Sequence, residues 1–291
     1  MARAMREGPS VAERLGYPAN ARLLVLHADD FGMSHSVNRA IAQALENHWI
    51  TSTSVMATCP WFPEALTFAR QHPDICLGVH FTLNSEWTSF RWGPVSRQES
   101  VASLLDDDGY LPLLETQVIE NARVSEVETE LRAQIEKVRG AGVAISHFDS
   151  HMLTLLGSEE LFATYMALSR DYGVPVRVIP APAFAVDDLP ARCKLLDGVC
   201  EAVPDFPANG WIEAYRKMLA PLPPGSYQLT VHLGFDDDEM QGASYDHPNW
   251  GAAWRQRDLD LVRDDGFRKF LADEGFKLVS WRDLARALDP A

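Results

Sequence analysis

Several stretches of this sequence place acidic residues or histidines at the end of an apolar run. Such residues are Asp29 and Asp30 after residues 23–26, His80 within residues 75–83, His147, Asp149 and His151 after residues 143–146, and His232 within residues 227–233. Taken singly each is ordinary, because loop-end acids are usually solvated and histidines are often structural. Together they recur at the same phase of successive strand–helix units, and strand carboxyl ends are where α/β sheets and barrels carry their chemistry.

The residue types favour a metal centre. One carboxylate and two imidazoles, with positions left for water, are typical of a catalytic rather than a structural metal site. Of the two adjacent acids, one can be a ligand while the other stays free as a base. Neighbouring residues on a strand point to opposite sides, so the turn at Phe31-Gly32 must rotate one carboxylate into the site. Two imidazoles favour zinc over magnesium, and we expect one divalent metal ion, zinc, with magnesium as the alternative.

Strands and helices must alternate to bring these residues together. Apolar runs predict strands over residues 23–26, 52–57, 75–83, 143–148, 176–179, 227–233 and 276–279. Helical spacing of apolar residues predicts helices over residues 37–49, 62–71, 159–172, 259–274 and 280–288, and a capping-box pattern at Ser125 and Glu128 predicts another helix start. This alternation is typical of βαβ units and a largely parallel sheet.

Two regions depart from the alternation. Residues 84–122 form a long insertion, predicted to lie over one end of the sheet, and long ordered loops are usually functional. Residues 180–190, rich in proline and alanine, are a predicted loop. Residues 1–20 have no apolar segment typical of a signal peptide, so we expect a loosely ordered lead-in followed by one domain over residues 21–291.

Composition narrows the class of protein. The chain has 291 residues, 46% of them hydrophobic and 23% charged, and its formal net charge is -15. This charge argues against nucleic acid and against an anionic membrane surface as partners, because both need a basic face. No apolar run approaches the roughly 20 residues that span a bilayer. The four cysteines have no close pairing, which predicts a reduced, cytoplasmic protein with buried thiols.

Ordered motifs run from one end of the chain to the other. They are residues 27–32 (HADDFG), 37–41 (VNRAI), 77–83 (LGVHFTL), 146–151 (SHFDSH), 232–235 (HLGF) and 280–284 (SWRDL). In residues and in order they resemble the YdjC-type (chitooligosaccharide deacetylase-like) carbohydrate deacetylases. The resemblance implies an α/β fold, a distorted (β/α) barrel, that removes an acetyl group from an N-acetylated amino sugar or short oligosaccharide with a divalent metal.

The resemblance also implies roles for individual residues. Asp30, His80 and His151 would be the metal ligands. Asp29 would be the general base toward the attacking water, and His232 the acid that protonates the leaving amine or polarises the intermediate. These roles suit the residue types, since an acetamide is a poor electrophile and a carboxylate beside a cation stays ionised.

The neighbouring residues have supporting roles in this interpretation. We expect His147 and Asp149 to orient loops or to hydrogen-bond to the ligands. The chain departs from the family's usual pattern at His27, where asparagine is usual, at residues 152–154, where a histidine-rich continuation is usual, and at Leu233, where proline is usual.

For each residue that could contact the substrate, the sequence leaves two roles open. Trp87, Phe90 and Trp92 in the insertion could stack on a sugar ring, or be buried against the barrel. Arg255 could reach the site, or pair with Asp258 on a solvated helix.

Two other functions remain open from the sequence. A metal-dependent sugar isomerase or epimerase on a similar barrel would need more carboxylate ligands, which we do not find at other strand ends. A non-catalytic carbohydrate-binding or metal-binding relative would not need the intact Asp29-Asp30 pair. We expect a small carbohydrate as partner, and a homo-oligomer is compatible with the sequence.

Overall fold

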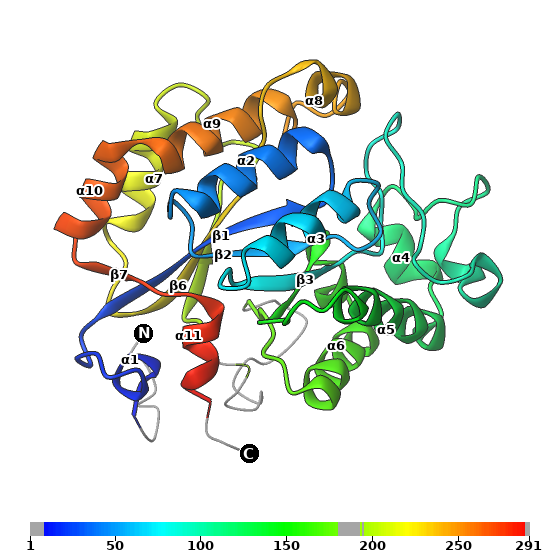
Figure 1. The fold of residues 1–291 in the computed structure, drawn as a ribbon, viewed down its shortest axis with the longest axis horizontal. Helices are drawn as coiled ribbons and strands as arrows, with labels where there is room; N and C mark the ends of the chain where they lie inside the picture. Colours follow the sequence, from blue (N-terminus) through cyan, green and yellow to red (C-terminus); the bar gives the residue numbers. More distant parts are fainter. Residues whose placement is uncertain (1–8, 180–192, 194, 289–291) are drawn as a thin grey trace.

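The computed structural model describes residues 9–179, 193 and 195–288. A parallel sheet of seven strands lies at its centre, in the order β4-β3-β2-β1-β6-β5, with β7 beside β1 (Figure 1). The strands are β1 (Arg22–Phe31), β2 (Ser52–Val55), β3 (Leu77–Phe81), β4 (Phe148–Ser150), β5 (Gly198–Cys200), β6 (Gly225–Val231) and β7 (Phe276–Leu278).

Strand β1 lies in the middle of this sheet and pairs with β2, β6 and β7. One of its edges pairs with β6 over residues 22–28, and the other edge is shared between β7 at residues 22–24 and β2 at residues 27–31. Among the described residues the path of paired strands ends at β4 and β5, and the sheet is a curled half-barrel, so the distorted barrel predicted from the sequence is confirmed.

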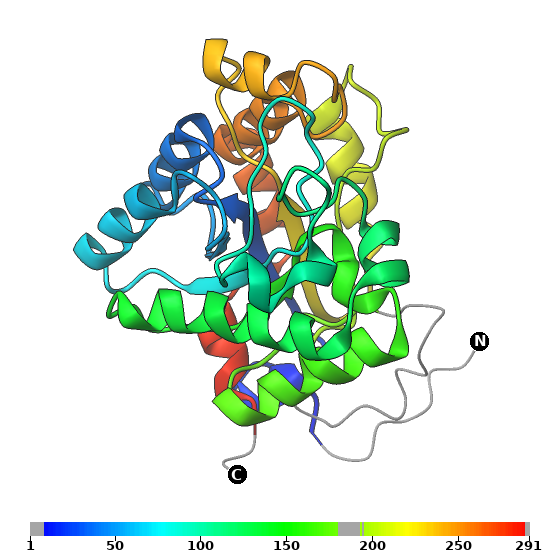
Figure 2. The same cartoon turned by 90° about the vertical axis from the view of Figure 1, so that its right-hand side faces the viewer.

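Helices flank the sheet, with α2, α3 and α9 along one side and α5 and α6 along another (Figures 1 and 2). In the described part of the chain they are α1 (Val11–Arg14), α2 (His35–Glu46), α3 (Phe62–Gln71), α4 (Glu115–Asn121), α5 (Val124–Gly140), α6 (Glu159–Tyr172), α7 (Trp211–Leu219), α8 (Asp238–Ala243), α9 (Ala252–Arg263), α10 (Asp265–Asp273) and α11 (Trp281–Arg286), with short 3-10 turns η1 (Gln98–Ser100), η2 (Ala102–Leu104) and η3 (His151–Leu156). Among these residues no helix combines the length and apolar character needed to cross a bilayer.

Strand β1 separates two apolar clusters, because successive side chains of a strand point to opposite faces. Leu24 and Leu26 belong to the larger cluster, which includes residues of the flanking helices. Leu23 and Val25 belong to a smaller cluster with Trp281 of α11. Residues of α1 and α11 therefore fill the inner side of the barrel at the amino end of β1.

The lead-in is more ordered than predicted. Ser10 caps α1, since its hydroxyl accepts from the Glu13 amide at 3.2 Å and its own amide donates to Glu13 at 2.8 Å. Val11 is buried in the smaller apolar cluster. Residues 10–14 therefore pack as part of the barrel, while residues 1–8 lie outside the described residues.

Two predicted strands differ most from the structure. Residues 143–147 do not join the named strands, and β4 covers only Phe148–Ser150. Backbone pairing with β3 begins where the Ser146 amide donates to Leu77. The predicted strand 176–179 contributes a single bridge between Val176 and Phe148. The predicted loop 180–190 lies outside the described residues.

Two predicted helices also differ. The predicted helix 259–274 is divided, because Asp264 takes an extended conformation and its carboxylate caps α10 by accepting from the Phe267 amide at 2.6 Å. The helix expected to start at Ser125 begins one residue earlier, with Arg123 as the N-cap and no side-chain cap. The capping-box prediction at Ser125 was therefore wrong, although the helix exists.

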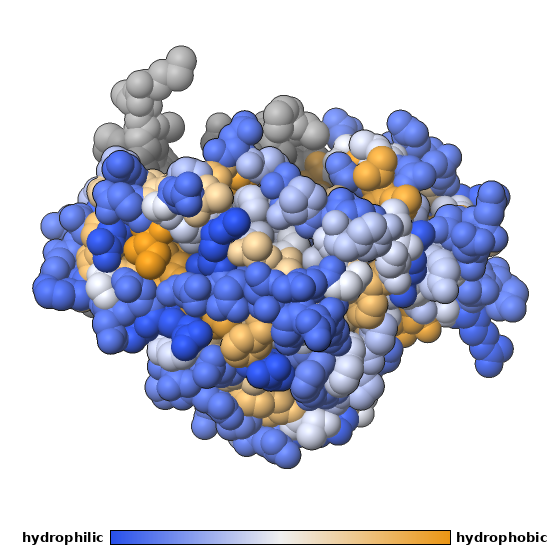
Figure 3. All heavy atoms as spheres, turned by 90° about the horizontal axis from the view of Figure 1, so that it is seen from above, coloured by the Kyte–Doolittle hydropathy of each residue, from blue (hydrophilic) through white to orange (hydrophobic). Residues whose placement is uncertain are grey.

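The insertion 84–122 folds into η1, η2 and α4, and its loops rise beside the helices α8 and α9 (Figure 2). The Thr88 hydroxyl donates to the Asp246 carboxylate, which joins the insertion to the loop after α8. The outer face drawn in Figure 3 is mainly hydrophilic, with apolar atoms in small separate patches. All four cysteines are buried, as expected.

Candidate active site

The inner face of the barrel changes from apolar to polar toward the carboxyl ends of the strands. On β1, His27 and Asp29 continue the face of Leu23 and Val25, and both are buried. The polar side chains that join them from neighbouring strands are also buried, namely Ser52, Ser54, His80, Asp149 and Thr230, and so is His147 directly before β4. Parallel strands thus bring their terminal polar residues to one place, as the phase of the motifs predicted.

A backbone irregularity brings both acids of β1 to this face. Pairing with β2 shifts register between Ala28 and Phe31, and Asp30 has φ 73, in the left-handed region. The rotation expected at Phe31-Gly32 is thus located at Asp30 itself. Gly32 follows with φ 96, and its amide donates to the Asn38 side chain at 2.6 Å, so that α2 fixes the turn.

Asp30, His80 and His151 form a compact triangle of donor atoms. Asp30 Oδ1 lies 3.4 Å from His80 Nε2 and 3.4 Å from His151 Nδ1, and the two nitrogens are 3.3 Å apart. Two ligands that are each about 2.0–2.1 Å from a tetrahedral zinc ion are separated by about 3.4 Å. Asp30 Oδ1 is buried and has no hydrogen bond from the described residues. The predicted ligand set is brought together with a spacing that fits a divalent metal.

The remaining polar atom of each of these residues is held by a partner. His80 Nδ1 donates to Asp149 Oδ1 at 2.8 Å, and His151 Nε2 donates to Glu86 Oε2 at 2.9 Å. These bonds leave His80 Nε2 and His151 Nδ1 facing Asp30. Such outer contacts fix the tautomer and the ring orientation of metal-ligating histidines.

Arg255 is the partner of Asp30. Its Nη2 donates to Asp30 Oδ2 at 2.8 Å, and its Nε donates to the Trp250 carbonyl at 2.6 Å. The sequence left two positions open for Arg255, and in the structure its side chain reaches the site. Asp258 instead accepts from the indole of Trp211 at 2.9 Å and from the His232 amide at 2.9 Å.

Asp29 lies beside the triangle without completing it. Its Oδ2 is 3.5 Å from Arg177 Nη1 and 3.9 Å from His80 Nε2, and its Oδ1 is 3.0 Å from His27 Nε2. Burial alone would raise the pKa of Asp29, but Arg177, His80 and the His27 hydrogen bond outweigh burial and hold the pKa below its ordinary value. Asp29 is therefore an ionised carboxylate at neutral pH, as a base must be.

The two histidines of the triangle are strongly basic in the metal-free protein. Burial would lower the pKa of His80, but Asp149, Asp29 and Asp30 outweigh burial and raise the pKa to about 10. For His151, Glu86 and Asp30 likewise outweigh burial and raise the pKa to about 9. A cation held here replaces these protons.

His232 follows β6, and its pKa is lowered rather than raised. Burial lowers its pKa to about 4, even though Asp30 and Asp29 act to raise it. Its ring lies 6.5 Å from the ring of Trp250. The imidazole is therefore neutral at neutral pH, which limits its use as a proton donor.

Other predicted residues occupy different places from those expected. Trp87 and Trp92 are 1% and 2% exposed, so neither offers a ring face to a sugar, because the insertion folds its own indoles inward. Asp149 accepts a hydrogen bond from His80. His147 contacts none of the three proposed ligands, since it stacks on Trp281 with ring centroids 4.9 Å apart and bonds to the Ser146 hydroxyl.

The sequence interpretation missed Glu86, Arg177 and a role for His27. Glu86 follows β3 within the insertion, and no periodicity marks it. Arg177 is a charged residue inside a predicted apolar strand, which is a signal that could have identified it. His27 Nε2 lies 3.0 Å from Asp149 Oδ2 as well as from Asp29, so it connects the proposed base to the partner of His80.

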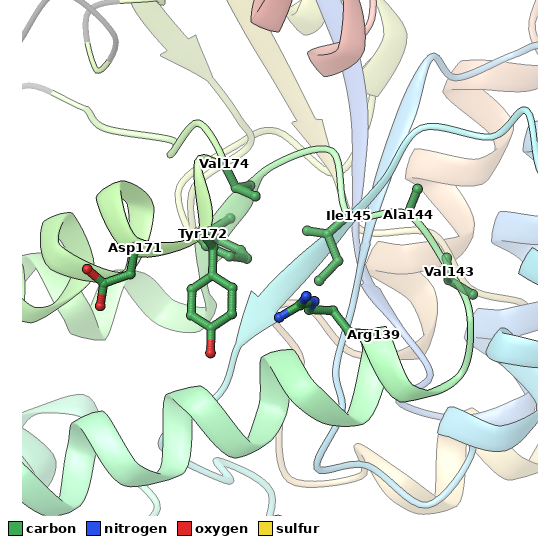
Figure 4. Close-up of a pocket in the computed structure, with 8 residues that line it drawn as sticks. Arg139, Val143, Ala144, Ile145, Asp171, Tyr172 and Val174 are labelled. Carbon is green, nitrogen blue, oxygen red and sulfur yellow. The ribbon is translucent and has the colours of Figure 1, made fainter. Parts of the chain in front are cut away.

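A separate surface pocket of about 380 Å³ lies between the end of α5, residues 143–145 and the end of α6 (Figure 4). Its wall includes Phe148 at the start of β4, whereas His151 follows the other end of that strand. None of the acidic residues, histidines or arginines of the candidate site lines it, so it is distinct from that site.

Comparisons with known proteins find relatives over most of the chain. The family model described as YdjC-like protein matches residues 23–273. A carbohydrate deacetylase of Thermus thermophilus is 30% identical over 286 residues, covering 95% of this chain and 98% of that protein. One from Thermoanaerobacter pseudethanolicus is 26% identical over 265 residues, covering 89% and 98%. A crystal structure from Enterococcus faecalis, described as a cellobiose-phosphate cleavage protein, shares the fold with a TM-score of 0.74, 24% identity and coverage of 91% and 99%.

Proposed function

This chain belongs to the YdjC-like family, and on that premise we propose that it is a carbohydrate deacetylase. It is a metal-dependent hydrolase that removes the acetyl group from an N-acetylated amino sugar or a short oligosaccharide. Relatives that match nearly the whole chain are named carbohydrate deacetylases, which favours this reaction over the isomerase and non-catalytic alternatives.

One observation carries the proposal. A donor triangle of Asp30, His80 and His151 stands beside Asp29, a buried carboxylate that is ionised and is not part of the triangle. A divalent metal held by the triangle would polarise the acetamide carbonyl and lower the pKa of water. Two imidazoles and one carboxylate favour zinc over magnesium for this position.

Asp29 is the general base in this proposal. Its carboxylate takes a proton from the attacking water as the oxygen bonds to the acetyl carbon. Arg177 and His27 keep the carboxylate in place, with contacts of 3.5 Å and 3.0 Å. Asp29 then holds that proton and can return it to the amine nitrogen when the C–N bond breaks. The same residue therefore accepts and donates the proton.

His232 polarises the substrate rather than acting as the first proton donor. A neutral imidazole has no extra proton to give to the amine, but its N–H can donate a hydrogen bond to the negative charge that develops on the carbonyl oxygen. Asp258 fixes the backbone of His232 through the amide at 2.9 Å. Of the two roles the sequence left open for His232, we propose the polarising one.

Acetate release tests the proposal. Metal-stripped protein is assayed with di-N-acetylchitobiose and a panel of N-acetylated sugars, before and after zinc, magnesium or nickel is restored. We expect no acetate without metal and most with zinc. Stoichiometric zinc binding without acetate from any member of the panel would contradict the deacetylase, and no metal binding at all would contradict the whole site.

A further inference from the structure

The start of the insertion contacts the candidate metal centre directly. Glu86 Oε2 lies 2.9 Å from His151 Nε2, and the Glu86 side chain is only 12% exposed. Charge-assisted hydrogen bonds of this kind are roughly twice as strong as neutral ones. The orientation of His151 therefore depends on a residue outside the barrel strands.

The next residue reaches a second member of the triangle through Arg255. The guanidinium carbon of Arg255 lies 5.5 Å from the ring centroid of Trp87, a distance typical of a cation–π contact, and Trp87 is 1% exposed. The same guanidinium donates to Asp30 at 2.8 Å. Trp87 thus packs against the group that holds Asp30.

Further contacts join the insertion to the turn that carries His151. Met152 and Leu153, directly after His151, have φ 48 and 56, a strained conformation for such residues. Asn84 Oδ1 accepts from the Thr154 hydroxyl at 3.0 Å, and the Asn84 carbonyl accepts from the Trp92 indole at 3.0 Å. The first bond joins the insertion to the turn, and the second fixes Asn84 within the insertion.

The insertion is itself braced at this point. The Ser85 amide donates to the Pro112 carbonyl at 2.7 Å, and the Leu111 amide donates to the Trp92 carbonyl at 3.1 Å. Residues 111 and 112 are therefore tied back to the first part of the insertion, which makes that part a firm support.

We propose that residues 84–92 are a positioning element of the metal centre, in which Glu86 fixes His151 and Trp87 fixes Asp30 through Arg255. The insertion then supplies part of the support of the metal as well as covering the barrel. The proposal rests on the metal centre of the proposed function and is independent of the sugar. Glu86 and Trp87 are positioning residues, since they act through the ligands.

Zinc affinity of the metal-stripped chain tests this proposal. Wild type, Glu86→Gln and Glu86→Ala are titrated with zinc against a chelating dye, and with cobalt followed by its visible spectrum. The matched control is Glu99→Gln, an exposed carboxylate of the same insertion. Affinities are corrected for the protons that zinc displaces, because loss of the Glu86 charge also lowers the pKa of His151 and so reduces competition from protons. After that correction we expect Glu86→Ala to bind zinc roughly 10- to 100-fold more weakly and the control to match wild type.

The other variants refine the expectation. Glu86→Gln keeps an oxygen that can accept from His151 but loses the charge, so its affinity should fall between wild type and Glu86→Ala. Trp87→Leu should weaken zinc binding by roughly two- to fivefold, the loss of one cation–π contact. Excess zinc should restore acetate release in Glu86→Ala, because the substitution acts on metal occupancy.

Two results would overturn the proposal. Wild-type zinc affinity in folded Glu86→Ala would overturn the proposal, as would an equal loss in Glu99→Gln. If Glu86→Ala does not fold, Glu86→Gln decides by the same criterion. If wild type binds zinc but releases no acetate, the proposed function fails while the zinc titrations still decide the role of Glu86.

Discussion

Zinc binding should release about two protons at neutral pH. In the metal-free protein the pKa of His80 is about 10 and that of His151 about 9, so both imidazoles are charged at pH 7. A ligating nitrogen must be deprotonated, so each bound zinc displaces both protons, and raising the pH favours binding. Each displaced proton changes the apparent affinity about tenfold per pH unit, which gives about 100-fold tighter binding at pH 8 than at pH 7.

With histidines of ordinary pKa, zinc binding would depend far less on pH. With a pKa of about 6.5 each, both would be mostly neutral at pH 7, and zinc affinity would change less than about twofold between pH 7 and pH 8. Calorimetric zinc titrations in buffers of different ionisation enthalpy count the released protons directly. Release of fewer than about one proton at pH 7 would refute the charge arrangement. In Glu86→Gln the count should fall, because the Glu86 charge helps to raise the pKa of His151.

Three further outcomes follow from the geometry. Asp29→Asn should lower turnover by about 10²- to 10⁴-fold while zinc content stays at the wild-type level; normal turnover would remove Asp29 as the base. Asp149→Asn should weaken zinc binding by about 10- to 100-fold in a dye competition titration, because it orients a ligand ring. Gly78→Ala should destabilise the fold by about 1–3 kcal/mol in urea unfolding, since the new Cβ would lie 2.4 Å from the His147 ring. Gly140→Ala, which meets no atom within 4 Å, is the matched control and should not be destabilised.

That these strand ends meet could be predicted from the sequence because two regular rules apply to them, whereas the choice of Asp30, His80 and His151 as ligands came from the family resemblance. Residues of one parity on a strand share a face, and parallel strands end at the same edge of a sheet. His80 on β3 and the residues after β4 obey both rules, so their phase along the chain brought them together. The parallel sheet and its barrel curvature rest on the same regularity.

Most of the supporting contacts could not be predicted because no such rule governs them. Glu86 meets His151 only because the insertion folds back over the barrel. Arg177 lies in a segment that makes one bridge with β4 instead of a full strand. The sequence leaves two roles open for Trp87 and Trp92, because an aromatic side chain suits a sugar site and a core equally well. Only the tertiary path of the insertion distinguishes them.

Strained backbone conformations place side chains at the site that strand alternation alone would turn away from it. The described non-glycine residues with positive φ are Asp30, His48, Met152, Leu153 and Trp250, and all except His48 lie at the metal centre or its supports. Such conformations cost about 1–3 kcal/mol each and persist only where their surroundings impose them. Arg255 bonds to two of these strained residues at once, to the Asp30 carboxylate at 2.8 Å and to the Trp250 carbonyl at 2.6 Å. Alternation alone would turn Asp30 away from Asp29, so the turned backbone and this guanidinium together make a ligand and a base out of two neighbouring residues.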